Sequence, residues 1–297
     1  MKQYITKSIL FLLLLMVILI LTDYYITKKL LKSDNISFGE ISVNNIILND
    51  TTNFDYLIYG SSRAKSNVNE LILNEELKLN SLNMGIQGHN FWLQYLRHKQ
   101  YLEHHKPPKF IIINVDWMTF QKKKELYNFN QFLPFMLWDL EIYDYTKSYD
   151  GFIFLDYLIP NYRYFGRKEL FFYSFSSLGN LNKKKHSEIL DSVYINFHQP
   201  TIDLFIKFIA ECKSLNIDLY LVHTPDYLAN QNIYTNRDEL IQLLDSISKS
   251  NNLIFIDYSN YFISANLKYF QDYGHLNEYG RNEFSKILSD SLKNLIK

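Results

Sequence analysis

The chain has 297 residues, with 31 basic and 31 acidic side chains and a formal net charge of zero. Proteins that bind nucleic acids need clustered lysine and arginine to neutralise phosphates, so this balance argues against that class. The single cysteine, Cys212, excludes an intramolecular disulfide and a cysteine-based metal cluster.

The first feature along the chain is an uncharged apolar run over residues 8–22, with lysines on both sides. It is shorter than the roughly 20 residues that usually span a bilayer, so a cleaved signal peptide is an alternative to an anchor. Residues 22–25 contain no Ala-x-Ala cleavage site, and their tyrosines suit a membrane interface. We therefore predict an uncleaved, single-pass anchor in the cell membrane over residues 1–34. Because an apolar N-terminus precedes a large polar domain, we expect that domain on the extracytoplasmic side.

From residue 53 onward, short apolar runs alternate with amphipathic segments. The expected strands are 56–59, 79–84, 110–115, 219–222 and 253–256. The expected helices are 69–78, 90–104, 202–214, 237–250 and 278–295. Continuous apolar strands suggest burial on both faces of a sheet. The pattern predicts an α/β fold, a three-layer α/β/α sandwich with a central, mainly parallel five-stranded sheet.

Between residues 117 and 200 this alternation fails, and the chain becomes rich in aromatic residues. We interpret the stretch as an insertion after the third strand, inside one domain of residues 35–297. A lid over the site, a surface that contacts the bilayer or a partner, and additional core all remain open as its role.

The first candidate site lies where the first expected strand ends, at Gly60, Ser61 and Ser62. Helical spacing further on puts these serines at or near the start of a helix. Free backbone N–H groups and the helix dipole there favour a developing oxyanion. An ordinary turn with capping serines is the alternative.

Two further blocks carry glycine, carboxylate and imidazole groups. Residues 83–88, after the second expected strand, contain two glycines that could present a backbone N–H to a substrate. Asp272 precedes His275 by three residues, just before the last expected helix. Such a carboxylate can orient the imidazole toward a hydroxyl elsewhere, which is how a serine nucleophile is activated. A helix-capping aspartate beside a surface histidine is the alternative.

Taken in order, these three blocks resemble the SGNH hydrolase superfamily, also called GDSL-like. The resemblance implies a flavodoxin-like sheet order, with Ser62 as the nucleophile, His275 as the general base and Asp272 as its orienting acid. It also implies that the backbone N–H groups of Ser62 and Gly85 donate to the oxyanion. It implies no cofactor.

Two departures from the family pattern affect the site. Ser61 replaces the usual aspartate, as also occurs in membrane-anchored members such as the D-alanyl transfer protein of teichoic acid modification. The third-block asparagine has no clean match, so Asn114 is only a candidate oxyanion donor. Arg63 and His89 are candidate substitutes, and with His223 they form the candidate substrate-binding set. For His223, a structural histidine with satisfied hydrogen bonds is the alternative that we favour.

The resemblance and the anchor together imply a serine esterase or O-acyltransferase that acts on an acylated cell-envelope polysaccharide or glycopolymer. A membrane-bound O-acyltransferase is a candidate partner. The alternative is a catalytically inactive docking component of a polymer-modifying complex, which the unmatched asparagine favours. No His-Glu-x-x-His motif, phosphate-binding glycine loop or Gly-x-Ser-x-Gly elbow occurs, so no metal is expected.

Overall fold

The computed structural model describes residues 1–32, 39–88, 91–122, 126, 128–167, 170 and 192–296. The chain divides into two compact units. Unit 1 comprises Met1–Ile46 and Lys124–Ser177, and unit 2 comprises Ile47–Lys123 and Leu178–Lys297. Most of the aromatic insertion therefore groups with the N-terminal segment.

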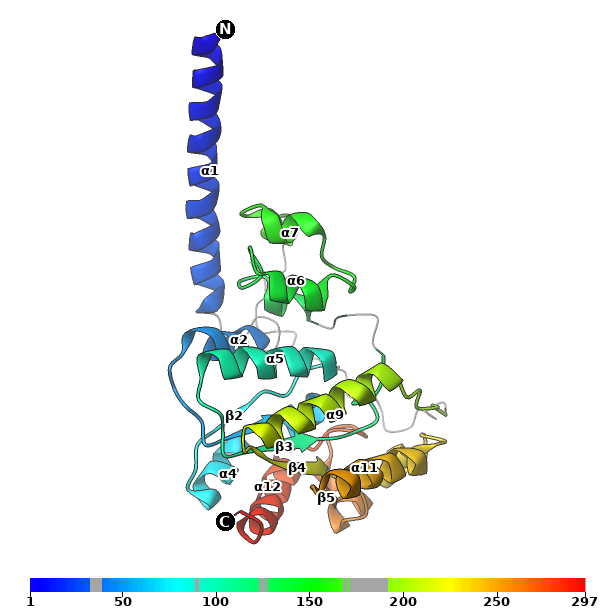
Figure 1. Ribbon diagram of the computed structural model, residues 1–297. Coiled ribbons are helices and arrows are strands. Elements are labelled where there is room, and N and C mark those ends of the chain that lie inside the picture. The colour runs from blue at the N-terminus through cyan, green and yellow to red at the C-terminus, as the bar shows by residue number, and fades with distance from the viewer. Residues whose placement is uncertain are drawn as a thin grey trace. The chain divides into compact units, whose positions relative to one another are not determined.

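Unit 2 is built on a five-stranded sheet in which every neighbouring pair is parallel (Figure 1). The strands are β1 (Tyr56–Tyr59), β2 (Ser81–Asn83), β3 (Phe110–Asn114), β4 (Asp218–His223) and β5 (Ile254–Asp257). Their order is β2-β1-β3-β4-β5, which reverses direction beside β1. Ligands of such sheets bind outside the carboxyl ends of the strands at this reversal. The predicted three-layer fold with its parallel sheet is confirmed.

Helices cover both faces of this sheet, which explains why its central strands are apolar without interruption. On one face, Tyr56, Ile58 and Ile112 belong to a buried core shared with Phe284 and Leu288. The helices of this layer are α3 (Ser62–Asn67), α4 (Glu70–Leu77) and α12 (Glu278–Lys293).

The opposite face is packed with aromatic side chains. Tyr59 of β1 lies 6.1 Å from Phe208 between ring centroids, and Phe91 packs edge-on against both Phe205 and Phe208. These rings come from α5 (Phe91–His104) and α9 (Gln199–Ser214), while α11 (Arg237–Asn251) packs against the edge strand β5. Alternate residues of each strand thus serve two separate cores. The remaining short elements of unit 2 are α10 (Leu228–Gln231), η5 (Phe262–Ala265) and η6 (Leu267–Tyr269).

Unit 1 contains the long helix α1 (Lys2–Leu31), which is apolar and long enough to cross a membrane (Figure 1). At about 1.5 Å per residue its 30 residues extend about 45 Å, because the helix continues through the polar residues on both sides of the apolar run. The other elements of this unit are η2 (Phe129–Phe132), α6 (Leu140–Thr146), α7 (Phe154–Leu158) and η3 (Tyr162–Tyr164). Helix α2 (Glu40–Asn49) begins in unit 1 and ends in unit 2.

Candidate active site

The turn after β1 places two serines at the start of a helix. Gly60 has φ +133°, and a Cβ atom there would lie 2.7 Å from the backbone oxygen of Asn114, so glycine is required. Ser61 is the N-cap of α3, since its Oγ accepts a hydrogen bond from the Arg63 N–H at 3.1 Å. Ser62 is therefore the first residue of the helix, at the carboxyl edge of the sheet.

Ser62 lies against the histidine from the far end of the chain. Its Oγ is 2.8 Å from Nε2 of His275, although 213 positions separate the two residues. The other ring nitrogen, Nδ1, lies 2.9 and 3.0 Å from the two carboxylate oxygens of Asp272. A carboxylate only accepts, so Nδ1 carries the proton and Nε2 is left to accept from the serine hydroxyl. The three side chains form one continuous chain of hydrogen bonds.

Asp272 is held in its ionised form. Partial burial by itself raises the pKa of this carboxyl, but the hydrogen bond and attraction of the His275 ring oppose it. The backbone N–H groups of Gly274 and His275 also donate to Oδ1, each at 2.9 Å, and the net pKa is lowered. A carboxylate ionised at neutral pH can stabilise an imidazolium beside it.

The loop that carries His275 is fixed from two sides. Tyr273 stacks on Tyr227, with ring centroids 5.8 Å apart and planes 10° apart. The fully buried Asn67 accepts the Leu276 N–H at 2.9 Å through Oδ1 and donates through Nδ2 to Thr224 Oγ1 at 3.1 Å. Asn67 thus ties the nucleophile helix α3 to the histidine loop. The sequence analysis missed this residue, because its role depends on contacts more than 150 positions away.

We expect Asn67→Ala to lower kcat by roughly 10- to 100-fold with little change in KM, since a shift of about 1 Å in the histidine can cost that much. Initial rates of ester hydrolysis by the folded variant measure this split. Asn74→Ala is the matched control, because Asn74 makes two 2.8 Å side-chain hydrogen bonds at the amino end of the sheet. If both variants keep the wild-type kcat, Asn67 does not position the histidine.

Behind the nucleophile, Ser61 is bound to a carboxylate from the neighbouring strand end. Its hydroxyl donates to Asp116, whose Oδ2 also accepts from Asn114 Nδ2 at 3.2 Å. All three side chains are buried. Ser61 is therefore held to the segment after β3. The hydrogen bond between Ser61 and Asp116 exists because β1 and β3 are neighbours in the sheet. It was not predicted from the sequence.

The predicted oxyanion donors other than Ser62 already have partners. The Asn114 side-chain amide donates to Asp116, and its Oδ1 accepts from the Thr224 N–H at 3.3 Å. The Gly85 N–H donates to Asn83 Oδ1 at 3.0 Å. In this geometry the Gly85 N–H and one of the two amide protons of Asn114 are already used within the protein. The N–H of Ser62 belongs to the first helical turn, so it has no acceptor within the helix and remains the candidate oxyanion donor.

Arg63 lies inside the protein, contrary to its prediction as a substrate-binding residue. Its side chain is 5% exposed. Nη2 donates to the backbone oxygens of Thr224 and Pro225 at 2.7 and 3.0 Å, and Nη1 lies 3.4 Å from Asp226 Oδ2. The guanidinium therefore braces the turn after β4 and is not presented to a substrate.

His223 is also buried, which agrees with the structural role given as its alternative and not with substrate binding. Its Nδ1 donates to the backbone oxygen of Val115 at 2.7 Å. Burial, reinforced by the charge of Arg63, lowers the pKa of His223, so the ring is neutral. The third predicted substrate-binding residue, His89, lies outside the described residues.

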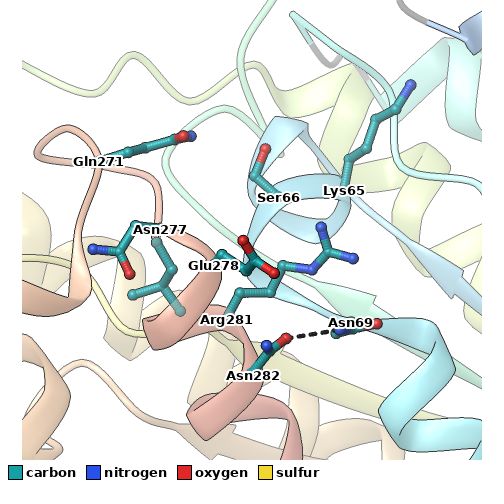
Figure 2. Close-up of a pocket in the computed structure, with 9 residues that line it drawn as sticks. Lys65, Ser66, Asn69, Gln271, Asn277, Glu278, Arg281 and Asn282 are labelled. Carbon is teal, nitrogen blue, oxygen red and sulfur yellow. Dashed lines mark hydrogen bonds between the residues drawn. The ribbon is translucent and has the colours of Figure 1, made fainter. Parts of the chain in front are cut away.

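A polar pocket of about 380 Å³ is lined by residues that are close in sequence to Ser62 and His275 (Figure 2). Lys65 and Ser66 follow Ser62 by three and four positions, so they lie on the same face of α3 as Ser62. Leu276 and Asn277 directly follow His275. The remaining lining residues are Asn69, Gln271, Glu278, Arg281 and Asn282, and Asn69 donates to Asn282 Oδ1 at 2.7 Å.

Within the described part of the chain, no group of three or more His, Cys, Asp or Glu side chains could hold a metal ion.

Neither family models nor curated proteins match this sequence. A comparison with solved structures finds several that are similar to this chain. A candidate acylhydrolase from Bacteroides fragilis is 13% identical with a TM-score of 0.46, and 90% of this chain and 100% of that one are covered. An acetyl xylan esterase is 15% identical with a TM-score of 0.43, covering 82% and 100%. A catalytic mutant of an acetylxylan esterase from Geobacillus stearothermophilus is 13% identical with a TM-score of 0.43, covering 82% and 95%.

The class of protein follows from this chain's own geometry. A parallel sheet of order β2-β1-β3-β4-β5 carries Gly60-Ser61-Ser62 after β1 and the Asp272–His275 pair before α12, with the serine and histidine in contact. This is the fold of the SGNH hydrolase superfamily, as the sequence blocks predict.

Proposed function

We propose that this protein is a membrane-anchored serine esterase or O-acyltransferase that acts on an acylated cell-envelope polysaccharide or glycopolymer. The observation that carries the proposal is the hydrogen-bonded series Ser62–His275–Asp272 at the carboxyl edge of the sheet. A capping serine on a helix would not require a distant imidazole at 2.8 Å, with its second nitrogen held by a carboxylate.

The mechanism follows from the three roles. His275 Nε2 takes the Ser62 proton as Oγ attacks the ester carbonyl, and Asp272 stabilises the resulting imidazolium. The Ser62 N–H at the start of α3 stabilises the oxyanion. When the tetrahedral intermediate collapses, His275 returns its proton to the departing alcohol and the acyl group stays on Ser62. Water or a sugar hydroxyl, deprotonated by His275, then accepts the acyl group and regenerates the serine.

The pocket beside α3 supports a hydroxyl-rich substrate. Eight of its nine lining residues are polar or charged, among them Lys65, Glu278 and Arg281. A site for a long acyl chain would instead be lined mainly by apolar side chains. The proposed ester is therefore a short acyl group on a polar polymer. The apolar helix α1 supports attachment to the membrane.

The acyl-enzyme is the intermediate that tests this proposal. Full-length protein in detergent is mixed with an activated acetyl ester, quenched in acid and analysed by peptide mass spectrometry. We expect an acetyl group on Ser62 and none in the corresponding peptide of Ser62→Ala. Adding a soluble glycan acceptor should divert acetyl from water to sugar if transfer is the reaction.

A folded protein that neither acetylates on Ser62 nor turns over the ester would contradict the proposal. That outcome would favour the docking component. The observation on its side is that the amides of Asn114 and Gly85 are bonded within the protein, so fewer oxyanion donors are directed at the site.

A further inference from the structure

Residues 153–165 of unit 1, the segment that includes α7 and η3, bury their charged side chains and expose most of their apolar ones, the reverse of the usual arrangement in a soluble protein. Their two charged residues, Asp156 and Arg163, are buried. Their exposed side chains are apolar or aromatic: Ile153, Phe154, Leu155, Leu158, Ile159, Tyr162 and Phe165. We call this set the apolar platform. Soluble proteins rarely expose so many large apolar side chains within one short segment unless something covers them.

Asn161, in the middle of the platform segment, binds the membrane helix α1 directly. Its side-chain Nδ2 donates to the backbone oxygen of Leu19 and to Thr22 Oγ1, both at 2.7 Å. Its backbone N–H donates to Asp23 Oδ2 at 2.6 Å. These contacts fix the platform segment against the last turns of the apolar run of α1.

A buried ion pair reinforces the same junction. Arg163 Nη2 lies 2.7 Å from Asp23 Oδ1, and the two side chains are 2% and 7% exposed. The same nitrogen donates to Thr27 Oγ1 at 3.2 Å, and Thr27 in turn contacts the Tyr164 hydroxyl at 2.7 Å. Cleavage after Asp23 would remove the carboxylate and leave Arg163 buried without its partner, which is strongly unfavourable. The junction therefore favours retention of α1.

We infer that the apolar platform inserts into the same lipid bilayer that α1 crosses, so that residues 153–165 form a second, interfacial membrane contact. The inference rests on the membrane anchor of the proposed function. The contacts at Leu19, Thr22 and Asp23 put the platform at the end of the lipid-facing run of α1, where acyl chains give way to head groups. Apolar and aromatic side chains facing outward at that depth match an interfacial element.

Continuity with α1 argues for lipid as the occupant of this surface. The apolar run of α1 is itself exposed along its length, so the two exposed apolar surfaces belong to one unit and meet at the Asn161 junction. A partner protein or a second copy of the chain would have to cover the platform while lipid surrounded the adjoining helix. The platform would anchor the aromatic insertion to the membrane surface.

Lipid-restricted fluorescence quenching tests this inference in the full-length protein reconstituted into phosphatidylcholine vesicles. Single cysteines replace the exposed Leu158 and, in a second variant, Phe154, and carry an environment-sensitive fluorophore. The native Cys212 is fully buried and does not compete for labelling. Leu12→Cys on α1 reports the anchor, and Leu71→Cys, an isolated exposed leucine on α4, is the aqueous control.

We expect nitroxides on the lipid acyl chains to quench the labels at Leu158, Phe154 and Leu12, and aqueous iodide to quench the label at Leu71. The inference would be overturned, with the anchor left intact, if lipid nitroxides quench the label at Leu12 but iodide quenches the labels at Leu158 and Phe154. Platform labels reached by neither quencher would overturn it in favour of a protein partner or a second copy. A Leu12 label reached only by iodide would refute the anchor and, with it, the platform.

Discussion

Ser62→Ala is expected to lower kcat/KM for ester hydrolysis by about 10⁴- to 10⁶-fold, because the hydroxyl forms the covalent intermediate and no other group can replace it. His275→Ala should cause a loss of similar size, since Ser62 Oγ has its hydrogen-bond acceptor 2.8 Å away on that ring. The double variant should lose no more than either single variant, because groups that act as a unit are strongly non-additive. Initial rates with an activated acetyl ester measure all three.

Ser214→Ala serves as the control for this series, because Ser214 is an exposed serine at the end of α9 that bonds only within its own helix turn. It should retain wild-type kcat/KM. If Ser62→Ala loses less than about tenfold, the nucleophile is another group, since a true triad serine contributes far more than this. Additive losses in the double variant would likewise contradict a shared proton-transfer role for Ser62 and His275.

Arg63→Ala is expected to lower the free energy of unfolding by about 3–5 kcal/mol, because it leaves Asp226 as a buried charge without its partner. Two backbone carbonyls, of Thr224 and Pro225, would also lose their donor. Urea unfolding of the full-length protein in detergent, followed by tryptophan fluorescence, measures the change. Arg63→Met with Asp226→Asn removes both charges and should lose less stability than Arg63→Ala.

Lys293→Ala is the comparison for Arg63, because it also removes a cation from an ion pair, with Glu76 at 2.7 Å, but on the surface. It should leave stability nearly unchanged. This series separates the buried brace seen in the structure from the substrate-binding role predicted from sequence. An Arg63→Ala protein as stable as wild type, but with a strongly raised KM, would show that the guanidinium contacts substrate.

The sheet could be predicted because its evidence is local. Strand β1 was predicted with the bounds that the structure shows, and helix α11 within one residue at its end. Strand β1 is an uninterrupted apolar run and helix α11 has an uninterrupted amphipathic pattern. The residues on either side break each pattern, which marks where the element begins and ends. The serine and the Asp272–His275 pair were found for a similar reason, since their spacing within each block carries the chemistry.

The roles of Arg63, His223 and Asn114 could not be predicted, because their partners are supplied by strand neighbours far along the chain. A sequence shows that these polar residues follow strands, but not that β1, β3 and β4 lie side by side and bury them. Arg63 and His223 were consequently considered as substrate-binding residues, and Asn114 as an oxyanion donor. In the structure each one satisfies buried backbone or carboxylate groups.

Unit 1 was the least predictable part, for two physical reasons. The helices α6 and α7 have only seven and five residues, too few for a periodic pattern to emerge from an aromatic-rich sequence. Asp23 directly follows the apolar run, and its partner Arg163 lies 140 positions away. An ion pair across such a distance leaves no local signal.

Active-site labelling of the full-length protein with a fluorophosphonate tests the central claim, an activated serine at the end of β1, most directly. Peptide mass spectrometry locates the adduct, with Ser62→Ala and His275→Ala as controls. The geometry predicts an adduct on Ser62 that disappears in Ser62→Ala and becomes far slower in His275→Ala. A folded protein that takes no label, or whose Ser62 label forms equally fast without His275, would contradict it.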